Sequence, residues 1–135
     1  NLIEGHPNEL NPNKRPLHTI IPAMISKNNE LIGSFGVMGG HYQAAGHAYV
    51  LSQMIDYGLS PQEALDCPRV FPNSNVLDFE KTFDDSIIED LASRGHEINY
   101  PVLPIGGGQI ILVDNKKNIL IGASDYRKDG CAIGY

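Results

Sequence analysis

Apolar residues follow two different spacings on either side of Gly40. Before it, the runs TIIPAMISK (19–27) and ELIGSFGVM (30–38) flank the turn-forming residues 27–29, a pattern that predicts a β-hairpin. Both runs are apolar at nearly every position in places, so we expect strands that are covered on both faces. After Gly40 the apolar residues recur every three to four positions, which predicts a largely buried helix that ends at Gly58.

The second half of the chain predicts further short elements, separated by turn and capping residues. Ser60, followed three residues later by Glu63, is typical of a capping box, and Pro68 would end that helix. The other expected elements are a helix that begins at Asp84 or Asp85 and ends at Gly95, short strands within 69–72, 75–80 and 96–102, and a second hairpin over 106–125 that turns at 114–117. This order indicates an α+β layered domain.

Residues 1–15 differ from the rest because they are rich in Asn, Pro and charge and have no apolar period. We interpret them as an extended arm or linker that needs another surface to order it, and residues 16–135 as one domain. Residue 1 is Asn and no signal-peptide pattern follows it, which indicates a processed chain or an excised piece of a longer one. This interpretation leaves both the cytoplasm and the periplasm open as compartments.

Composition narrows the classes of function. With a formal net charge of −6 and no dense group among its ten basic residues, the chain is not expected to bind nucleic acid. No apolar stretch is long enough to cross a bilayer, so we expect no membrane partner. Cys67 and Cys131 lie far apart in sequence and belong to no CxxC pair, which predicts two reduced thiols.

Several kinds of active site find no support in the sequence. His41 and His47 would lie about 240° apart around a helix, so they are not expected to bind one metal ion together. The glycines 106–108 precede a strand instead of opening a helix, which indicates close backbone packing or room for a ligand and not a phosphate loop. Neither a GxSxG elbow nor a Cys-His signature is present. We therefore expect no metal and no cofactor.

Gly39 and Gly40 stand where a predicted strand meets a predicted helix. Glycines at such a junction expose consecutive N–H groups without side-chain cover, and the helix dipole adds partial positive charge. This arrangement suits the developing negative charge on oxygen in an acyl-transfer intermediate. A tight turn without a chemical role is the alternative explanation of the same two residues.

Ordered motifs over nearly the whole chain, from about Pro12 to Tyr135, resemble those of the gamma-glutamyltranspeptidase family of N-terminal nucleophile hydrolases. They are PNKRPLHTIIPAMISKNNELIGSFGVMGG, QMIDYGLSPQEALDCPRVF, IIEDLASRGHEI and GGGQIILVDNKKNILIGASDYRKDGCAIGY. The stretch MGGHYQ is more similar to the acylase-like branch than to the glutathione-cleaving transpeptidases. The resemblance implies that residues 16–135 are the C-terminal part of the family's small subunit, within a four-layer αββα sandwich.

The resemblance also implies how the chemistry is divided. The family cleaves itself into two subunits, and the new N-terminal Thr of the small subunit is the nucleophile, with its α-amino group as base. Because residue 1 here is Asn, we expect that nucleophile outside this chain. Gly39 and Gly40 correspond to the pair whose N–H groups form the family's oxyanion hole. The implied partners are the large subunit, the N-terminal part of the small subunit and a small-molecule amide or γ-glutamyl substrate.

Four further residues correspond to positions in the family's substrate pocket. His18 and Thr19 stand in the place of two serines that hold the substrate's α-carboxylate, and only Thr19 keeps a hydroxyl group. Met38 replaces a proline before the glycines, and His41 replaces a serine after them. These differences leave the substrate undecided: we expect an amide or acyl compound other than glutathione, and the alternative is that His18 only packs under the glycine loop and does not affect specificity.

The sequence thus predicts the oxyanion-hole fragment of an amide hydrolase or acyltransferase that is inactive on its own. The alternative is a non-catalytic binding or interaction module that kept the fold and lost the chemistry. A homo-oligomer is compatible with either function.

Overall fold

The computed structural model describes all 135 residues, and its central element is a four-stranded antiparallel sheet with the strand order β1-β2-β6-β7. Its strands are β1 (Ala23–Lys27), β2 (Glu30–Met38), β6 (Gly107–Asp114) and β7 (Ile119–Ser124). Both predicted hairpins are confirmed, but the first strand begins at Ala23 and not at Thr19. Asn28 and Asn29 turn the first one with φ angles of 53° and 63°, and asparagine tolerates this left-handed conformation better than most residues.

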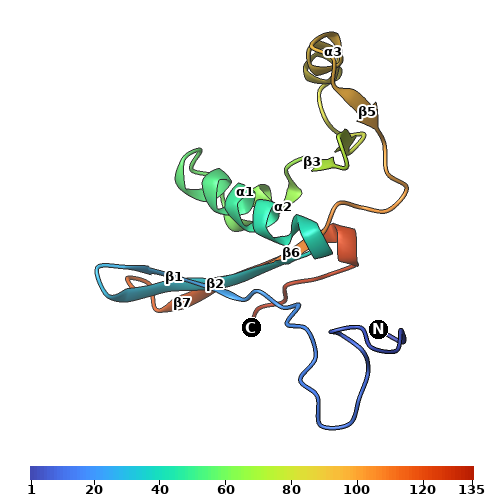
Figure 1. Ribbon diagram of the computed structural model, residues 1–135. Helices are drawn as coiled ribbons and strands as arrows, with labels where there is room; N and C mark the ends of the chain where they lie inside the picture. Colours follow the sequence, from blue (N-terminus) through green and yellow to red (C-terminus); the bar gives the residue numbers. More distant parts are fainter.

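Helices lie on one face of this sheet (Figure 1). A short 3₁₀ helix η1 (Gly40–Tyr42) leads into α1 (Gln43–Ile55), and α2 (Pro61–Asp66) follows. The predicted capping box is confirmed, since the Ser60 hydroxyl accepts from the Glu63 amide and the Glu63 side chain accepts from the Ser60 amide. The core between helices and sheet consists of Phe35, Val37, Tyr42, Val50, Ala64, Leu65, Ile105, Ile110 and Ala123.

The other face of the sheet is open in this chain. Along β2, Phe35 and Val37 are buried toward the helices, whereas Ser34 and Met38 on the opposite side are exposed. The prediction of strands covered on both faces is therefore wrong for these residues, because the chain supplies helices to one face only. This alternation is typical of a sheet with a single covered face.

Helix α1 is less buried than its composition predicts. Only Gly46 and Val50 are fully buried within it, and Ala44 and Ala48 are exposed. Alanine carries little information about burial because it is also the best helix former. Gly46 marks the side that faces the sheet, since a Cβ there would lie 2.6 Å from both Tyr42 and Val37.

A smaller sheet, with the order β3-β4-β5, stands apart from the main sheet (Figure 1). It consists of β3 (Val70–Asn73), β4 (Val76–Phe79) and β5 (Glu97–Asn99), with α3 (Asp85–Ser93) between the last two strands. Asp84 caps α3, as one of the two predicted alternatives had it. After β7 the chain forms a short 3₁₀ helix η2 (Tyr126–Lys128).

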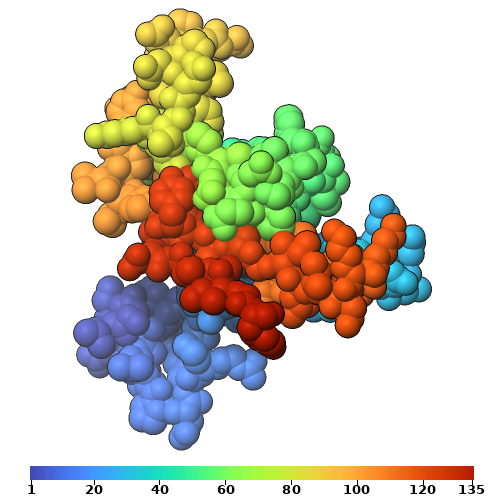
Figure 2. Space-filling view, turned by 180° about the vertical axis from the view of Figure 1, so that it is seen from behind, coloured from blue at the N-terminus to red at the C-terminus, as the bar shows by residue number.

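The surface is large for a chain of this size. Its accessible area is 9888 Å², whereas a compact monomer of the same mass, 14.8 kDa, exposes about 7,000 Å². Residues 1–22 contain no helix or strand, and the space-filling view shows this arm and the α3 region standing away from the central body (Figure 2). No helix has the length and apolar character needed to span a membrane.

Candidate active site: a glycine loop over a groove

The loop between β2 and η1 is built on two glycines with positive φ angles. Gly39 has a φ of 136°, and a Cβ at this position would lie 2.9 Å from the Cα of Gly106. Gly40 has a φ of 59°, and a Cβ there would meet no atom within 4 Å. The predicted strand-to-helix junction is thus confirmed. The fold requires glycine at 39 for space and conformation, but at 40 only for conformation.

The amides of this loop are free of intramolecular partners. Neither Gly39 N–H nor Gly40 N–H donates to a side chain or to a backbone carbonyl outside the regular elements, whereas the Gly39 carbonyl accepts from the Tyr42 amide at 3.1 Å. The turn is therefore closed through its carbonyl groups and leaves its donors available. Both donors lie at the N-terminal end of the continuous η1–α1 segment, where the helix dipole is positive.

An open groove of about 610 Å³ runs beside the loop. Its lining includes Thr19, Met38, Gly39, Gly40 and Gln43, together with residues 20–22, 34–37 and 109–111. Of the six residues singled out in the sequence, four line this groove. His18 and His41 are exposed and do not line it.

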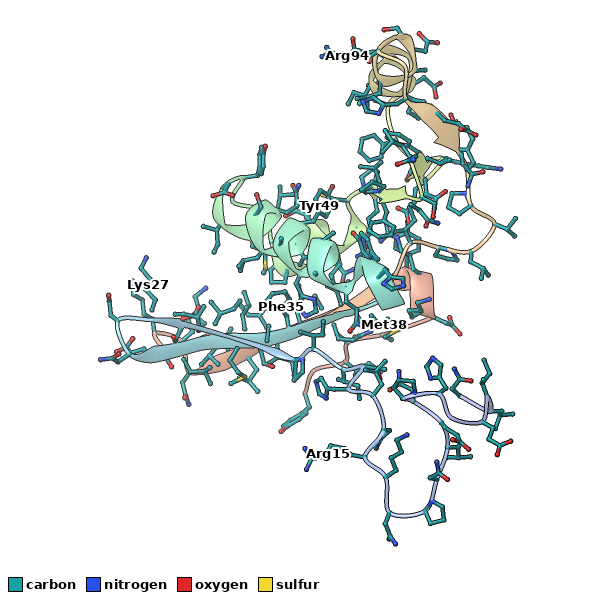
Figure 3. The ribbon with its side chains drawn as sticks, viewed as in Figure 1. Arg15, Lys27, Phe35, Met38, Tyr49 and Arg94 are labelled. Carbon is teal, nitrogen blue, oxygen red and sulfur yellow. The ribbon has the colours of Figure 1, made fainter.

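Two features border the groove: a side chain of α1 that is tied to the arm, and the residues along β2. The Gln43 Nε2 atom donates to the Thr19 carbonyl at 3.0 Å and to the Gly40 carbonyl at 3.3 Å, so the arm is tied to the glycine loop. Phe35 lies between β2 and α1, and Met38 lies at the end of β2 (Figure 3). Core residues fill the space between β2 and α1, and the groove runs along β2 between the arm and the glycine loop.

A buried cluster of charges supports the strand beside the loop. Asp125 is fully buried, and its Oδ2 atom accepts from Arg69 Nη2 at 2.7 Å and from the Gly108 amide at 2.8 Å. Arg69 is also fully buried and donates through Nη1 to the Ile105 carbonyl at 2.9 Å. Because Gly107 pairs with Met38 in the sheet, this cluster fixes the start of β6 directly beside the end of β2.

Arg127 extends the same cluster to the smaller sheet. It forms an ion pair with Glu80, and it donates to the Leu65 and Cys67 carbonyls at 2.7 and 2.9 Å. Burial by itself would lower the pKa of Arg127, but the hydrogen bond and charge of Glu80 raise it above its usual range. The guanidinium therefore stays charged. It joins the end of α2 to the strands beyond it.

The carboxyl of Asp125 is held in its charged form as well. Burial alone would raise its pKa, but the Arg127 amide and the charge of Arg69 outweigh burial and bring the pKa below its usual value. The sequence interpretation missed this cluster entirely. A signal was present in ILIGASDYR, where an acidic and a basic residue follow directly on an apolar run.

Other candidate chemistry lies outside the groove. No group of three His, Cys, Asp or Glu side chains could hold a metal ion. Cys67 and Cys131 are free thiols, and burial raises the pKa of Cys67. Of the two explanations offered for the glycines 106–108, the structure favours close packing, since a Cβ at Gly106 would lie 2.5 Å from the Met38 carbonyl oxygen.

The α+β fold with its glycine junction above an open sheet is that of the N-terminal nucleophile hydrolases. A cephalosporin acylase from Bacillus halodurans is 43% identical, with a TM-score of 0.77 over 93% of this chain and 24% of its own. The sequence model of the gamma-glutamyltranspeptidase family matches residues 1–135, and the chain belongs to this family.

Relatives of known name point to the same family. The glutathione hydrolase-like YwrD proenzyme of Bacillus subtilis is 33% identical over 98% of this chain and 27% of its own length. The acylase ACY 1 proenzyme of a Pseudomonas species (strain V22) is 29% identical over 90% of this chain and 22% of its own. The chain thus spans about a quarter of the length of these relatives and corresponds to one part of a larger protein.

Proposed function

We propose that this chain supplies the oxyanion hole and one wall of the substrate groove of an amide hydrolase or acyltransferase. The observation that carries the proposal is the pair of partnerless amides at Gly39 and Gly40, which lie before a helix and on a groove of about 610 Å³. The resemblance of GVMGG to the family's oxyanion segment supports the same role. The remainder of the precursor, namely the large subunit and the N-terminal part of the small one, completes the site.

The glycine amides act on the charge that develops during acyl transfer. When a nucleophile adds to the substrate carbonyl, the carbonyl oxygen takes up the electron pair of the broken π bond, and Gly39 and Gly40 donate hydrogen bonds to it. The amine then leaves with the proton that the base took from the nucleophile, and water or a second amine accepts the acyl group. The nucleophilic Thr and its α-amino base come from outside this chain, as in the family.

Gly40→Ala in the complete protein is expected to lower kcat about 100-fold, or about 3 kcal/mol, with a smaller change in KM. Alanine at a φ of 59° is strained by roughly 1–2 kcal/mol and would turn the peptide away from its present plane. Since a Cβ at Gly40 meets no atom within 4 Å, packing is not the cause of the loss. Steady-state kinetics on an amide substrate measure the effect.

Gly58→Ala is the matched control. Gly58 has a φ of 69°, also has free space around a Cβ, and lies beyond α1 and away from the groove. The Gly58→Ala protein should lose about as much stability as the Gly40→Ala protein and keep its kcat. If Gly40→Ala kept full kcat, the glycine pair would be a tight turn without a chemical role. A complete protein without amide hydrolysis would favour the alternative function, a non-catalytic binding or interaction module.

We further propose that the acyl group lies along Thr19 and Met38, with His18 and His41 at the rim of the groove. The substrate is an amide or γ-glutamyl compound. Two hydroxyl groups at positions 18 and 19 could each donate to a carboxylate, but His18 removes one of them. This favours an amide or acyl compound other than glutathione.

His18→Ser in the complete protein is expected to raise kcat/KM for glutathione about tenfold, because serine restores one hydrogen bond to a charged carboxylate. His96→Ser, the same change at another exposed histidine, beside the smaller sheet, should have no effect. The measurement compares kcat/KM for glutathione in the three proteins. High activity of the wild type that the serine does not improve would show that His18 does not set specificity.

A further inference from the structure

The first turn of α1 reaches the segments on both sides of the groove. Gln43 Nε2 donates to the carbonyl of Thr19 and to that of Gly40, at 3.0 and 3.3 Å. Since both partners are carbonyl oxygens, the side chain must present its NH₂ group to them, and each of its two hydrogens serves one carbonyl. A single side chain therefore joins the arm to the carbonyl of the second glycine.

His47 holds the strand before the loop. Its Nδ1 atom lies 2.7 Å from the Gln43 carbonyl, and its Nε2 atom lies 3.4 Å from the Val37 amide. A carbonyl accepts and an amide donates, so the two contacts together fit the tautomer that carries its proton on Nδ1. β1 begins at Ala23, opposite Phe35, so β2 has no strand partner on that side at Val37. The Val37 amide, which has no strand partner on that side, donates to His47 instead.

We propose that Gln43 and His47 are a positioning pair that fixes the glycine loop so that its free amides face the groove. The proposal rests on the oxyanion role of Gly39 and Gly40 and names the residues that set its geometry. Glycine has the most backbone freedom of any residue, so two in succession need anchors outside the loop. Anchors are present before the loop, at Val37 N–H, and after it, at the Gly40 carbonyl.

The two side chains are linked to each other as well as to the loop. His47 Nδ1 donates to the backbone carbonyl of Gln43, and its ring packs against Phe35 with a centroid distance of 5.1 Å. A displacement of the ring would therefore disturb both the end of β2 and the start of α1. Misplacement of a catalytic group by about 1 Å is enough to cost roughly 100-fold in rate, so such anchors matter to turnover.

Gln43→Glu in the complete protein tests the pair. A carboxylate has the same shape but cannot donate to the two carbonyls, so we expect kcat to fall about 10- to 100-fold with little change in KM. Hydrogen–deuterium exchange over residues 35–42 should become faster. Gln62→Glu is the matched control, because Gln62 bridges α2 to the Ser124 backbone by the same kind of amide hydrogen bonds, away from the groove.

Two variants of His47 separate positioning from packing. His47→Phe keeps an aromatic ring beside Phe35 and loses both hydrogen bonds, so it should reproduce the loss in kcat. His47→Gln retains a donor and an acceptor and should recover most of it. A Gln43→Glu protein with wild-type kcat and exchange, or one that loses no more kcat than Gln62→Glu, would overturn the proposal.

The outcomes separate this proposal from the one on which it rests. If Gly40→Ala lowers kcat and Gln43→Glu does not, the oxyanion role stands and the positioning role is wrong. If neither variant lowers kcat, the oxyanion role of the glycine pair is wrong too. The exchange measurement reports on the loop even in a protein without activity: there, faster exchange over residues 35–42 in Gln43→Glu than in Gln62→Glu supports the anchoring, and unchanged exchange overturns it.

Discussion

Asp125→Asn is expected to lower the free energy of unfolding of the complete protein by about 4 kcal/mol, because removing one member of a buried ion pair leaves the other uncompensated. Asp125 faces Arg69 and Arg127, and the three side chains are almost fully buried. The Nε atom of Arg69 already has no hydrogen-bond partner, so the cluster has no unused acceptor that could replace the Asp125 carboxylate. Urea denaturation of the variant and the wild type measures the difference.

Asp90→Asn serves as the control for this change. Asp90 and Arg94 form an ion pair at 2.8 Å on the surface of α3, with side chains that are 55% and 67% exposed. Such pairs contribute at most about 1 kcal/mol, so the same substitution should hardly move the urea midpoint. Equal losses in the two variants would show that the buried cluster does not stabilise the fold more than a surface pair.

The pH dependence of stability gives a second measure of Asp125. Its pKa is lowered in the folded protein, and the unfolded value is about 3.9. The stabilisation from its charged form is therefore complete above about pH 4 and is lost as the pH falls through the lower folded pKa. Asp125→Asn removes this titration, so the gap between wild type and variant should narrow in acid.

Much of the fold could be predicted because its signals are local. The capping box needs only Ser60 and Glu63, three residues apart, and the first hairpin needs two asparagines that accept positive φ angles. Burial is decided by distant parts of the chain, and the predictions that β2 is covered on both faces and that α1 is largely buried were wrong. The contact side of α1 is marked by Gly46, a residue with no side chain to give a hydrophobic signal.

The same distinction applies to the candidate site. The junction at Gly39 and Gly40 could be predicted, since strand, glycines and helix are consecutive in sequence. The link from Gln43 to Thr19 spans 24 residues, and the pair of Arg69 with Asp125 spans 56. A polar residue in an amphipathic pattern is ordinarily assigned to solvent, so only the folded chain shows that these side chains hold the loop and the strand beside it.

Residues 1–135 expressed alone are expected to show no hydrolysis of a γ-glutamyl anilide above the buffer rate. An oxyanion hole stabilises charge that a nucleophile has to create, and the rate advantage of a positioned nucleophile disappears when it is absent. The chain is also expected to self-associate, because the open face of the main sheet exposes apolar side chains. These include Met24, Ile111 and Leu120, which are 68%, 52% and 69% exposed.

The expected inactivity follows from the missing nucleophile, and the expected self-association follows from the uncovered surface of the chain. The accessible area is 9888 Å², against about 7,000 Å² for a compact monomer, and the open face of the sheet belongs to this excess, so we expect the remainder of the precursor to pack there. Addition of the separately produced remainder of the precursor should therefore restore hydrolysis and abolish self-association together, as measured by anilide release and light scattering. Turnover by the chain alone would place a nucleophile within these 135 residues. A monodisperse, inactive monomer would instead show that the open face needs no cover.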